Sequence, residues 1–214
     1  GVIMLSIVNG QPRELGLIDV IKRFIEHRVD VVRRRTDFLL RKAREREHLL
    51  LGFQRALDNL DAVIQIIRSS KTPKEAREGL TGVSITAEQI AAVRQLEERG
   101  VRGGAEATAR FAAVLELLNA GRAPFDFSER QAQAIIELQL QRLTGMEQQK
   151  ILDELAEIQR MIAGYLEILG SEEVLREVIV KELKDVRKEF GDQRRTVIIE
   201  DTGEIMLEDL IQME

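Results

Sequence analysis

The sequence predicts a mainly α fold: a long antiparallel coiled-coil arm that carries a helical globular tip, with a small β element at its base. Composition is the first reason. Aromatic residues make up 4% and charged residues 32% of the 214-residue chain, which holds only 3 Pro. This is typical of long helices rather than of a β-sandwich or a compact α/β enzyme. The second reason is that apolar residues recur at alternating steps of four and three in two separate segments, which we expect to pair.

The first residues, 1–16, predict a strand and a turn at the arm base. The run VIMLSIV is β-like, and Asn9-Gly10 is a turn signal. Residues 2–8 are therefore expected to form a short strand.

A long outgoing helix is predicted over residues 17–60. Its four-three spacing runs from Ile25 to Leu60, over about five heptads. Such a helix extends about 60 Å, which is too long for one compact domain without a partner helix. The predicted seam includes Val32, Leu39, Leu50, Phe53 and Leu57.

The partner is predicted over residues 146–190, as two returning helices in succession. The seam of the first contains Leu155, Ile158, Ile162, Tyr165 and Leu169. It is expected to end at Gly170, and a second amphipathic helix follows up to Phe190. An outgoing helix and two returning helices imply an antiparallel arm.

Residues 191–214 predict strands at the arm base. They contain RRTVIIED and EIML on either side of a Thr-Gly turn. Because the arm returns to its starting point, we expect these strands to lie beside the N-terminal strand.

Residues 61–145 are predicted to form the tip at the far end of the arm. Pro73 begins a short helix, and two weaker helices follow within residues 80–124. A further helix is expected from Glu129 to Gly145, because Ser128 and Gln131 have the spacing of a capping box.

The last of these helices is apolar over a wide arc. The arc contains Ala132, Ile135, Ile136, Leu138, Leu140 and Leu143, with Gln139 and Arg142 inside it. At 100° per residue these positions span roughly 200°, whereas a surface helix needs a stripe only a little over about 100° wide. Half of this face therefore needs a second partner.

Positive charge is concentrated in the outgoing helix. Residues 22–46 hold ten Lys/Arg against four Asp/Glu, although the whole chain has a net charge of −5. Two interpretations stay open: a nucleic-acid face with Arg33, Arg34 and Arg35 as DNA contacts, or a solvated helix surface with intrahelical ion pairs. Consecutive arginines point in different directions, so the three face one phosphate track only in part.

Residues suited to catalysis or metal binding are few. The chain has no Cys, which excludes disulfides and thiolate metal sites and indicates a reducing compartment. His27 and His48 lie about 30 Å apart on one helix and cannot share a metal. Tyr165 lies at a seam position, which favours packing over a nucleophilic role. We therefore expect no catalysis, metal or cofactor in this chain by itself.

The sequence also indicates where the protein is found. No apolar run approaches the roughly 18 residues of a membrane span, and the first residues do not have the pattern of a signal peptide. We expect a cytoplasmic protein without membrane contact. The chain begins at Gly1 and reads as a segment of a longer protein.

Two long blocks carry a resemblance to a known family. They are QAQAIIELQLQRLTG, residues 131–145, and FGDQRRT, residues 190–196, and the likeness covers nearly the whole chain. The chain resembles the A subunits of bacterial DNA gyrase, with those of topoisomerase IV a close second. The similar segment is the coiled coil and exit gate, also called the C-gate, of a type IIA DNA topoisomerase.

The resemblance implies a homodimer through the tips of two arms. One side of the helix over 129–145 would contact its own arm, and the other side the same helix of a second subunit. The implied dimer interface is Ile135, Leu138, Gln139, Arg142 and Leu143. This gate would hold the subunits together during double-strand cleavage and open to release the transported duplex.

The resemblance places other parts of the family outside this segment. The catalytic Tyr and its winged-helix region come before it, and the DNA-wrapping domain comes after it. ATP-dependent negative supercoiling requires the B subunit, double-stranded DNA, Mg and ATP in the parent complex. Two features depart from the family pattern: Leu39 replaces a common acidic residue, and residues 80–124 contain an insertion close to the gate.

Two alternatives use the same residues without a topoisomerase role. A structural homodimerising coiled-coil arm would have the same seam, but it gives no reason for a compact tip and flanking strands. A basic-helix nucleic-acid-binding module would use the arginines of the outgoing helix, and its DNA binding would depend steeply on salt.

Overall fold

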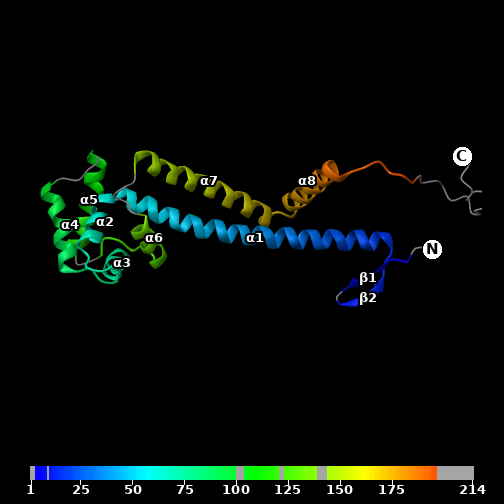
Figure 1. Ribbon diagram of the computed structural model, residues 1–214, viewed down its shortest axis with the longest axis horizontal. Helices are drawn as coiled ribbons and strands as arrows, with labels where there is room; N and C mark the ends of the chain where they lie inside the picture. The colour runs from blue at the N-terminus through cyan, green and yellow to red at the C-terminus, as the bar shows by residue number, and fades with distance from the viewer. Residues whose placement is uncertain (1–2, 9, 100–103, 121–122, 139–143, 197–214) are drawn as a thin grey trace, which may run out of the picture.

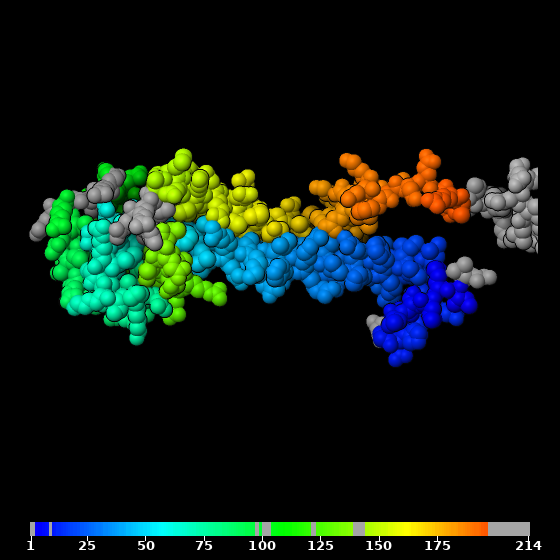
Figure 2. Space-filling view, viewed as in Figure 1, coloured from blue at the N-terminus to red at the C-terminus, as the bar shows by residue number. Residues whose placement is uncertain are grey.

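The computed structural model describes residues 3–8, 10–99, 104–120, 123–138 and 144–196. Within them the chain forms eight helices and a two-stranded antiparallel sheet. Figure 1 shows an elongated molecule with a long arm and a group of short helices at one end. The space-filling view in Figure 2 shows that the short helices pack into a compact cluster at this end. The predicted fold class, a mainly α antiparallel arm with a helical tip and a small β element, is confirmed.

The arm consists of α1 (Leu17–Asp58), α7 (Gly145–Gly170) and α8 (Glu172–Phe190). The 42 residues of α1 extend about 63 Å, and α7 and α8 return along it in succession (Figure 1). The two returning helices are separated at Ser171, whose side chain accepts a hydrogen bond from the backbone N–H of Val174 and so begins α8. The outgoing helix ends at Asp58, two residues earlier than predicted.

Apolar contacts along the arm fall into three successive clusters. From base to tip they are Val32 with Leu175 and Ile179, then Leu40 and Ala43 with Ile162, and then the tip core, which takes in Leu50, Phe53 and Leu155. All but one of the remaining predicted seam residues are half-buried against these clusters. The half-buried residues are Leu57, Ile158, Tyr165 and Leu169.

Leu39 is the exception, and its prediction as a seam residue is wrong. Leu39 is 38% exposed, whereas Leu40 is 5% exposed and takes its place. A strict four-three spacing requires one continuous partner helix that supercoils with α1. The partner of α1 changes from α8 to α7 between Val32 and Leu40. The buried residues of α1 there are therefore spaced by four and four rather than by four and three.

The tip is built around the last turns of α1. Its helices are α2 (Leu60–Ser69), α3 (Pro73–Thr81), α4 (Ala87–Arg99), α5 (Gly104–Asn119) and α6 (Glu129–Glu137). The short helix predicted from Pro73 is α3, and the two weaker helices are α4 and α5. The tip core also holds Phe125 and Phe127, whose stacked rings have centroids 5.4 Å apart.

A buried glutamine joins three of the tip helices. Gln89 of α4 has no exposed surface. Its Nε2 donates to Ser70 Oγ at 2.8 Å and to the carbonyl oxygen of Glu75 at 3.3 Å, and its Oε1 accepts the backbone N–H of Thr86 at 2.8 Å. Because its polar atoms are paired, this burial does not leave an unsatisfied amide in the core.

The end of α6 differs from the prediction. The capping box of Ser128 and Gln131 is present, but α6 ends at Glu137 rather than at Gly145. Gly145 instead begins α7, because Thr144 and Glu147 form a second capping box. The wide apolar arc is therefore not carried by one continuous helix, and residues 139–143 lie outside the described residues.

The base of the arm carries a hairpin. Strands β1 (Leu5–Val8) and β2 (Gln11–Glu14) pair in an antiparallel register, with Val8 opposite Gln11. Gly10 has φ 76°, a left-handed conformation that glycine adopts without strain. The sequence predicted only the first strand. At the other end of the chain, residues 191–196 form no strand, and the rest of the predicted C-terminal strands lies outside the described residues.

No helix in the described part of the chain is long and apolar enough to cross a membrane.

Candidate dimer interface and arm contacts

The predicted interface residues fall into three groups in the structure. Ile135 has no exposed surface and belongs to the core of its own tip, so it is not available to a second copy of the chain without rearrangement. Leu138, which follows α6, is half-buried against the same core. Gln139, Arg142 and Leu143 lie outside the described residues. The assignment of these residues to a dimer contact stays a prediction.

The start of α6 is fixed to α1 by a polar network. Gln131 Nε2 donates to the carbonyl oxygen of His48 at 2.7 Å, and His48 Nε2 lies 2.7 Å from Ser128 Oγ. Gln131 and Ser128 also pair reciprocally as the capping box. Since these contacts join the two helices at their crossing, they set the direction in which the chain leaves α6 toward the predicted interface.

A glycine allows this close crossing. A Cβ atom built on Gly52 would lie 2.7 Å from Gln131 Cγ and 3.0 Å from Gln131 Cβ. Those atoms are near the backbone and have little freedom to move. Any larger residue at position 52 would therefore push α6 away from α1.

An exposed apolar residue lies directly after the predicted interface segment. Met146, in the first turn of α7, is 72% exposed. The sequence interpretation missed it because it ends a helix at Gly145. The spacing of Thr144 and Glu147, which marks a helix start, was the signal that could have found it.

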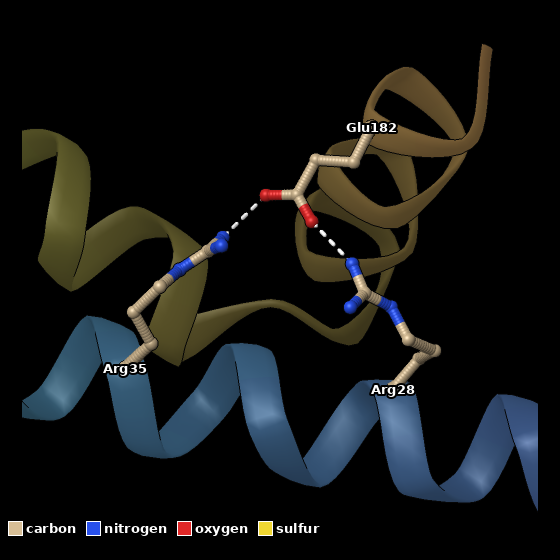
Figure 3. Close-up of polar contacts among 3 residues, drawn as sticks. All are labelled: Arg28, Arg35 and Glu182. Atoms are coloured by element: carbon tan, nitrogen blue, oxygen red, sulfur yellow. Dashed lines mark hydrogen bonds and ion pairs between the residues drawn. The ribbon is translucent and has the colours of Figure 1, made fainter. Parts of the chain in front are cut away.

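One carboxylate bridges α1 and α8 near the arm base. Glu182 of α8 accepts a hydrogen bond from Arg28 at 2.5 Å and another from Arg35. Figure 3 shows the two guanidinium groups approaching different oxygens of this carboxylate from α1. The side chains of Arg28 and Glu182 are 27% and 28% exposed. This partial burial strengthens the pairing relative to a fully exposed ion pair.

A second ion pair joins α1 to α7 beside the seam. Arg46 Nε and a terminal nitrogen donate to the two oxygens of Glu154 at 2.7 and 2.8 Å. The hydrogen bonds from Arg46 lower the pKa of Glu154, and the same hydrogen bonds raise the pKa of Arg46. The edge of the seam is therefore held by charge as well as by apolar contact.

The three arginines predicted as DNA contacts have different surroundings. Arg34 pairs with Asp30 at 2.9 Å, and Arg35 pairs with Glu182. Arg33 is exposed and has no ion-pair partner in the described part of the chain. Two of the three charges thus have carboxylate partners, but only the pair of Arg34 with Asp30 is intrahelical, as the interpretation of a solvated helix surface expects, because Glu182 lies on α8. A DNA contact here stays a prediction.

Tyr165 lies within the arm, and the described residues contain no evident metal site. The Tyr165 side chain is half-buried beside the Leu40, Ala43 and Ile162 cluster. Within residues 3–196, leaving out the gaps between the described ranges, no group of three or more His, Asp or Glu could hold a metal ion.

The fold and these contacts define a long helical arm with a compact tip, and the helix that returns from the tip begins with an exposed apolar residue, Met146. Residues 1–184 match the sequence profile of the family of A subunits of DNA gyrase and topoisomerase IV. The chain belongs to this family, and the resemblance seen in the sequence is confirmed.

Relatives of known name agree with the family match. The DNA gyrase A subunit of Pseudomonas aeruginosa is 44% identical over 100% of this chain and 22% of its own length. That of Salmonella typhimurium is 41% identical over 100% of this chain and 24% of its own length. That of Aminobacterium colombiense is 39% identical over 99% of this chain and 21% of its own length. The chain thus spans less than a quarter of the length of each of these relatives.

Proposed function

We propose that this chain is the exit-gate arm of a DNA gyrase A subunit. Two copies associate through their tips and form a gate that holds the subunits together while both DNA strands are cut. The gate then opens to release the transported duplex. The observation that carries the proposal is the exposed apolar side chain of Met146, which with the half-buried Leu138 flanks in sequence the segment 139–143, where the remaining predicted interface residues lie.

The arm supports this role mechanically. Apolar clusters along α1 join it to α7 and α8 over most of its length. Because close-packed helices resist bending, motion at the base is transmitted to the tip rather than absorbed between them. An interface that contains polar residues loses less on opening than an entirely apolar one, and Gln139 and Arg142 are polar residues of the proposed interface.

The chemistry of the reaction belongs to other parts of the complex. Cleavage of DNA, ATP hydrolysis with Mg, and negative supercoiling require the B subunit together with the rest of the gyrase A chain, in the cytoplasm. The only tyrosine, Tyr165, is half-buried within the arm, and we assign it no role in DNA cleavage. The isolated chain is expected to have no topoisomerase activity.

The test is the solution mass of the chain by light scattering over a concentration series. The chain is expected to be a dimer, and Leu138→Asp with Leu143→Asp to be a monomer, because a charge in an apolar contact is desolvated without a partner. Leu138 also contacts the tip core, so Met146→Asp provides a second variant on an exposed side chain. Helical content is measured for each by circular dichroism.

Val83→Asp is the matched control. Val83 is 78% exposed on the tip and lies outside the proposed interface, so this variant should remain a dimer. Either of two results would rule out the tip as the dimer contact. One is a parent chain that is monomeric, and the other is that Met146→Asp and the double variant both dimerise as well as the parent.

A further inference from the structure

An open groove lies between α1 and α6 at the root of the tip, on a face that no predicted site uses. Its volume is about 1150 Å³, and it is lined by residues of α1, α6 and α3. Figure 1 shows α6 beside α1 on the side opposite to α7. The groove is open to solvent, and one of its lining residues, Arg46, also takes part in the pairing of α1 with α7 through Glu154.

The groove is basic in an acidic chain. Its lining contains six Lys/Arg and three Glu, whereas the whole chain has a net charge of −5. Three of the basic residues are engaged with carboxylates: Lys42 with Glu45 at 3.2 Å, Arg46 with Glu154 at 2.7 Å, and Arg41 with Asp37 at 3.7 Å.

The other three basic residues, Arg44, Arg77 and Arg130, come from three different helices: α1, α3 and α6. None of them has an acidic partner among the described residues. The Nε atom of Arg77 is also buried without a hydrogen-bond partner.

We propose that this groove binds the phosphate backbone of duplex DNA through Arg44, Arg77 and Arg130. Guanidinium groups bind phosphate oxygens in a bidentate geometry. Three of them, held on separate helices around one open groove, suit an extended polyanion better than a single enclosed anion. The inference rests on the proposed function and deepens it, since it gives the arm a contact with the DNA that the gate handles.

This contact is distinct from Arg33 to Arg35 on the same helix. There, two of the three arginines already have carboxylate partners, whereas Arg44, Arg77 and Arg130 have none in the described structure. Phosphate contacts carry no sequence information, so binding is expected to be independent of DNA sequence and sensitive to salt.

The experiment measures binding of a fluorescent 20-base-pair duplex to the 214-residue chain by anisotropy over a series of NaCl concentrations. The variant Arg44→Gln, Arg77→Gln, Arg130→Gln is compared with a control that removes three exposed charges from α7 and α8: Arg160→Gln, Lys181→Gln, Lys184→Gln.

The groove variant should bind the duplex about tenfold more weakly than the parent chain at low salt. The slope of log K against log salt should fall by about 2 to 3 for that variant, since each lost phosphate contact removes about one counterion. The control should change affinity less than about threefold.

Equal losses in the two triple variants would overturn the proposal, because binding would then follow net charge alone. Absence of duplex binding at low salt would also overturn it. Binding of inorganic phosphate is measured in a separate experiment, by calorimetric titration. Phosphate binding without duplex binding would identify a small-anion site instead. Circular dichroism checks that the variant with Arg77→Gln is folded. The double variant Arg44→Gln, Arg130→Gln changes exposed positions only and tests the groove without altering the partly buried Arg77.

The oligomeric state is measured in the same samples. A dimer that fails to bind DNA would contradict the groove contact and leave the proposed gate intact. A monomer whose DNA binding depends on the three groove arginines would support the groove contact and contradict the gate.

Discussion

Gln131 shows how one side chain links the local and the long-range structure. Its role in the capping box with Ser128 was predictable from the spacing of three residues. Its bond to the carbonyl oxygen of His48 was not, because the two residues are 83 positions apart and nothing in the sequence indicates where α6 crosses α1. Gly52 permits the crossing, and nothing in the sequence indicates this role either. Local hydrogen bonding is readable from spacing, and helix crossing is not.

Glu154 allows a test at the residue scale through pH. The pKa of Glu154 is lower in the folded chain than its usual value of 4.5, because Arg46 donates to both of its oxygens. A carboxylate with a lowered folded pKa stabilises the folded state above its unfolded pKa, and this stabilisation is lost as the pH falls through the folded pKa. The Arg46 and Glu154 side chains are 45% and 40% exposed, so we expect about 0.5–1 kcal/mol at pH 7.

The measurement is urea unfolding of the parent chain and of Glu154→Gln between pH 7 and pH 3. Glu154→Gln should lower the free energy of unfolding at pH 7, and the difference should shrink below about pH 4.5. Glu157→Gln, on the exposed surface of α7, is the matched control and should not show this dependence. A difference that stays constant down to pH 3 would contradict the ion pair.

At the scale of elements, α8 is held to α1 by few contacts. Its buried apolar residues are Leu175 and Ile179, and the only cluster that they form with α1 in the described structure is the small one around Val32. Further along α8, Leu183, Val186 and Phe190 are 40%, 54% and 72% exposed. The bridge from Glu182 to Arg28 and Arg35 is therefore the principal polar contact of α8 with α1 among the described residues.

Removing this bridge should loosen α8 without affecting the tip. Glu182→Gln keeps the shape of the side chain and removes its charge, which leaves Arg28 and Arg35 without a carboxylate. Hydrogen exchange over residues 172–190 is expected to become roughly tenfold faster, because local opening reflects local stability. Glu177→Gln, exposed on the same helix, should leave exchange unchanged. Unchanged exchange in Glu182→Gln, or faster exchange in the tip as well, would contradict this account.

Helices were easier to predict than their ends. The long spacing of apolar residues predicted α1, α7 and α8, since packing along one face is periodic. The end of α6 was missed because leucines recur past Glu137, at positions 138, 140 and 143, while the capping box of Thr144 and Glu147 starts a new helix. The strand β2 was missed because QPRE has no alternating apolar pattern, and pairing with β1 alone defines it.

For the whole molecule, the distribution of exposed apolar residues separates tip from base. At the tip end of the molecule, Val83 of the tip and Met146 in the first turn of α7 are 78% and 72% exposed. The base exposes several apolar residues on the first turns of α1, among them Leu17 and Ile18 at 63% and 68%. Association through the tip is therefore a specific claim, because a second apolar surface is present at the other end of the arm.

The chain has no native Cys, so a cysteine introduced at one position reports contact between two copies at that position alone. The most direct measurement is cross-linking of Met146→Cys with a short bismaleimide, compared with Val83→Cys and Leu17→Cys. The account predicts that covalent dimers form rapidly with Met146→Cys and only slowly with the other two. Rapid cross-linking of Leu17→Cys instead, or equal rates at all three positions, would contradict a dimer that closes through the tip.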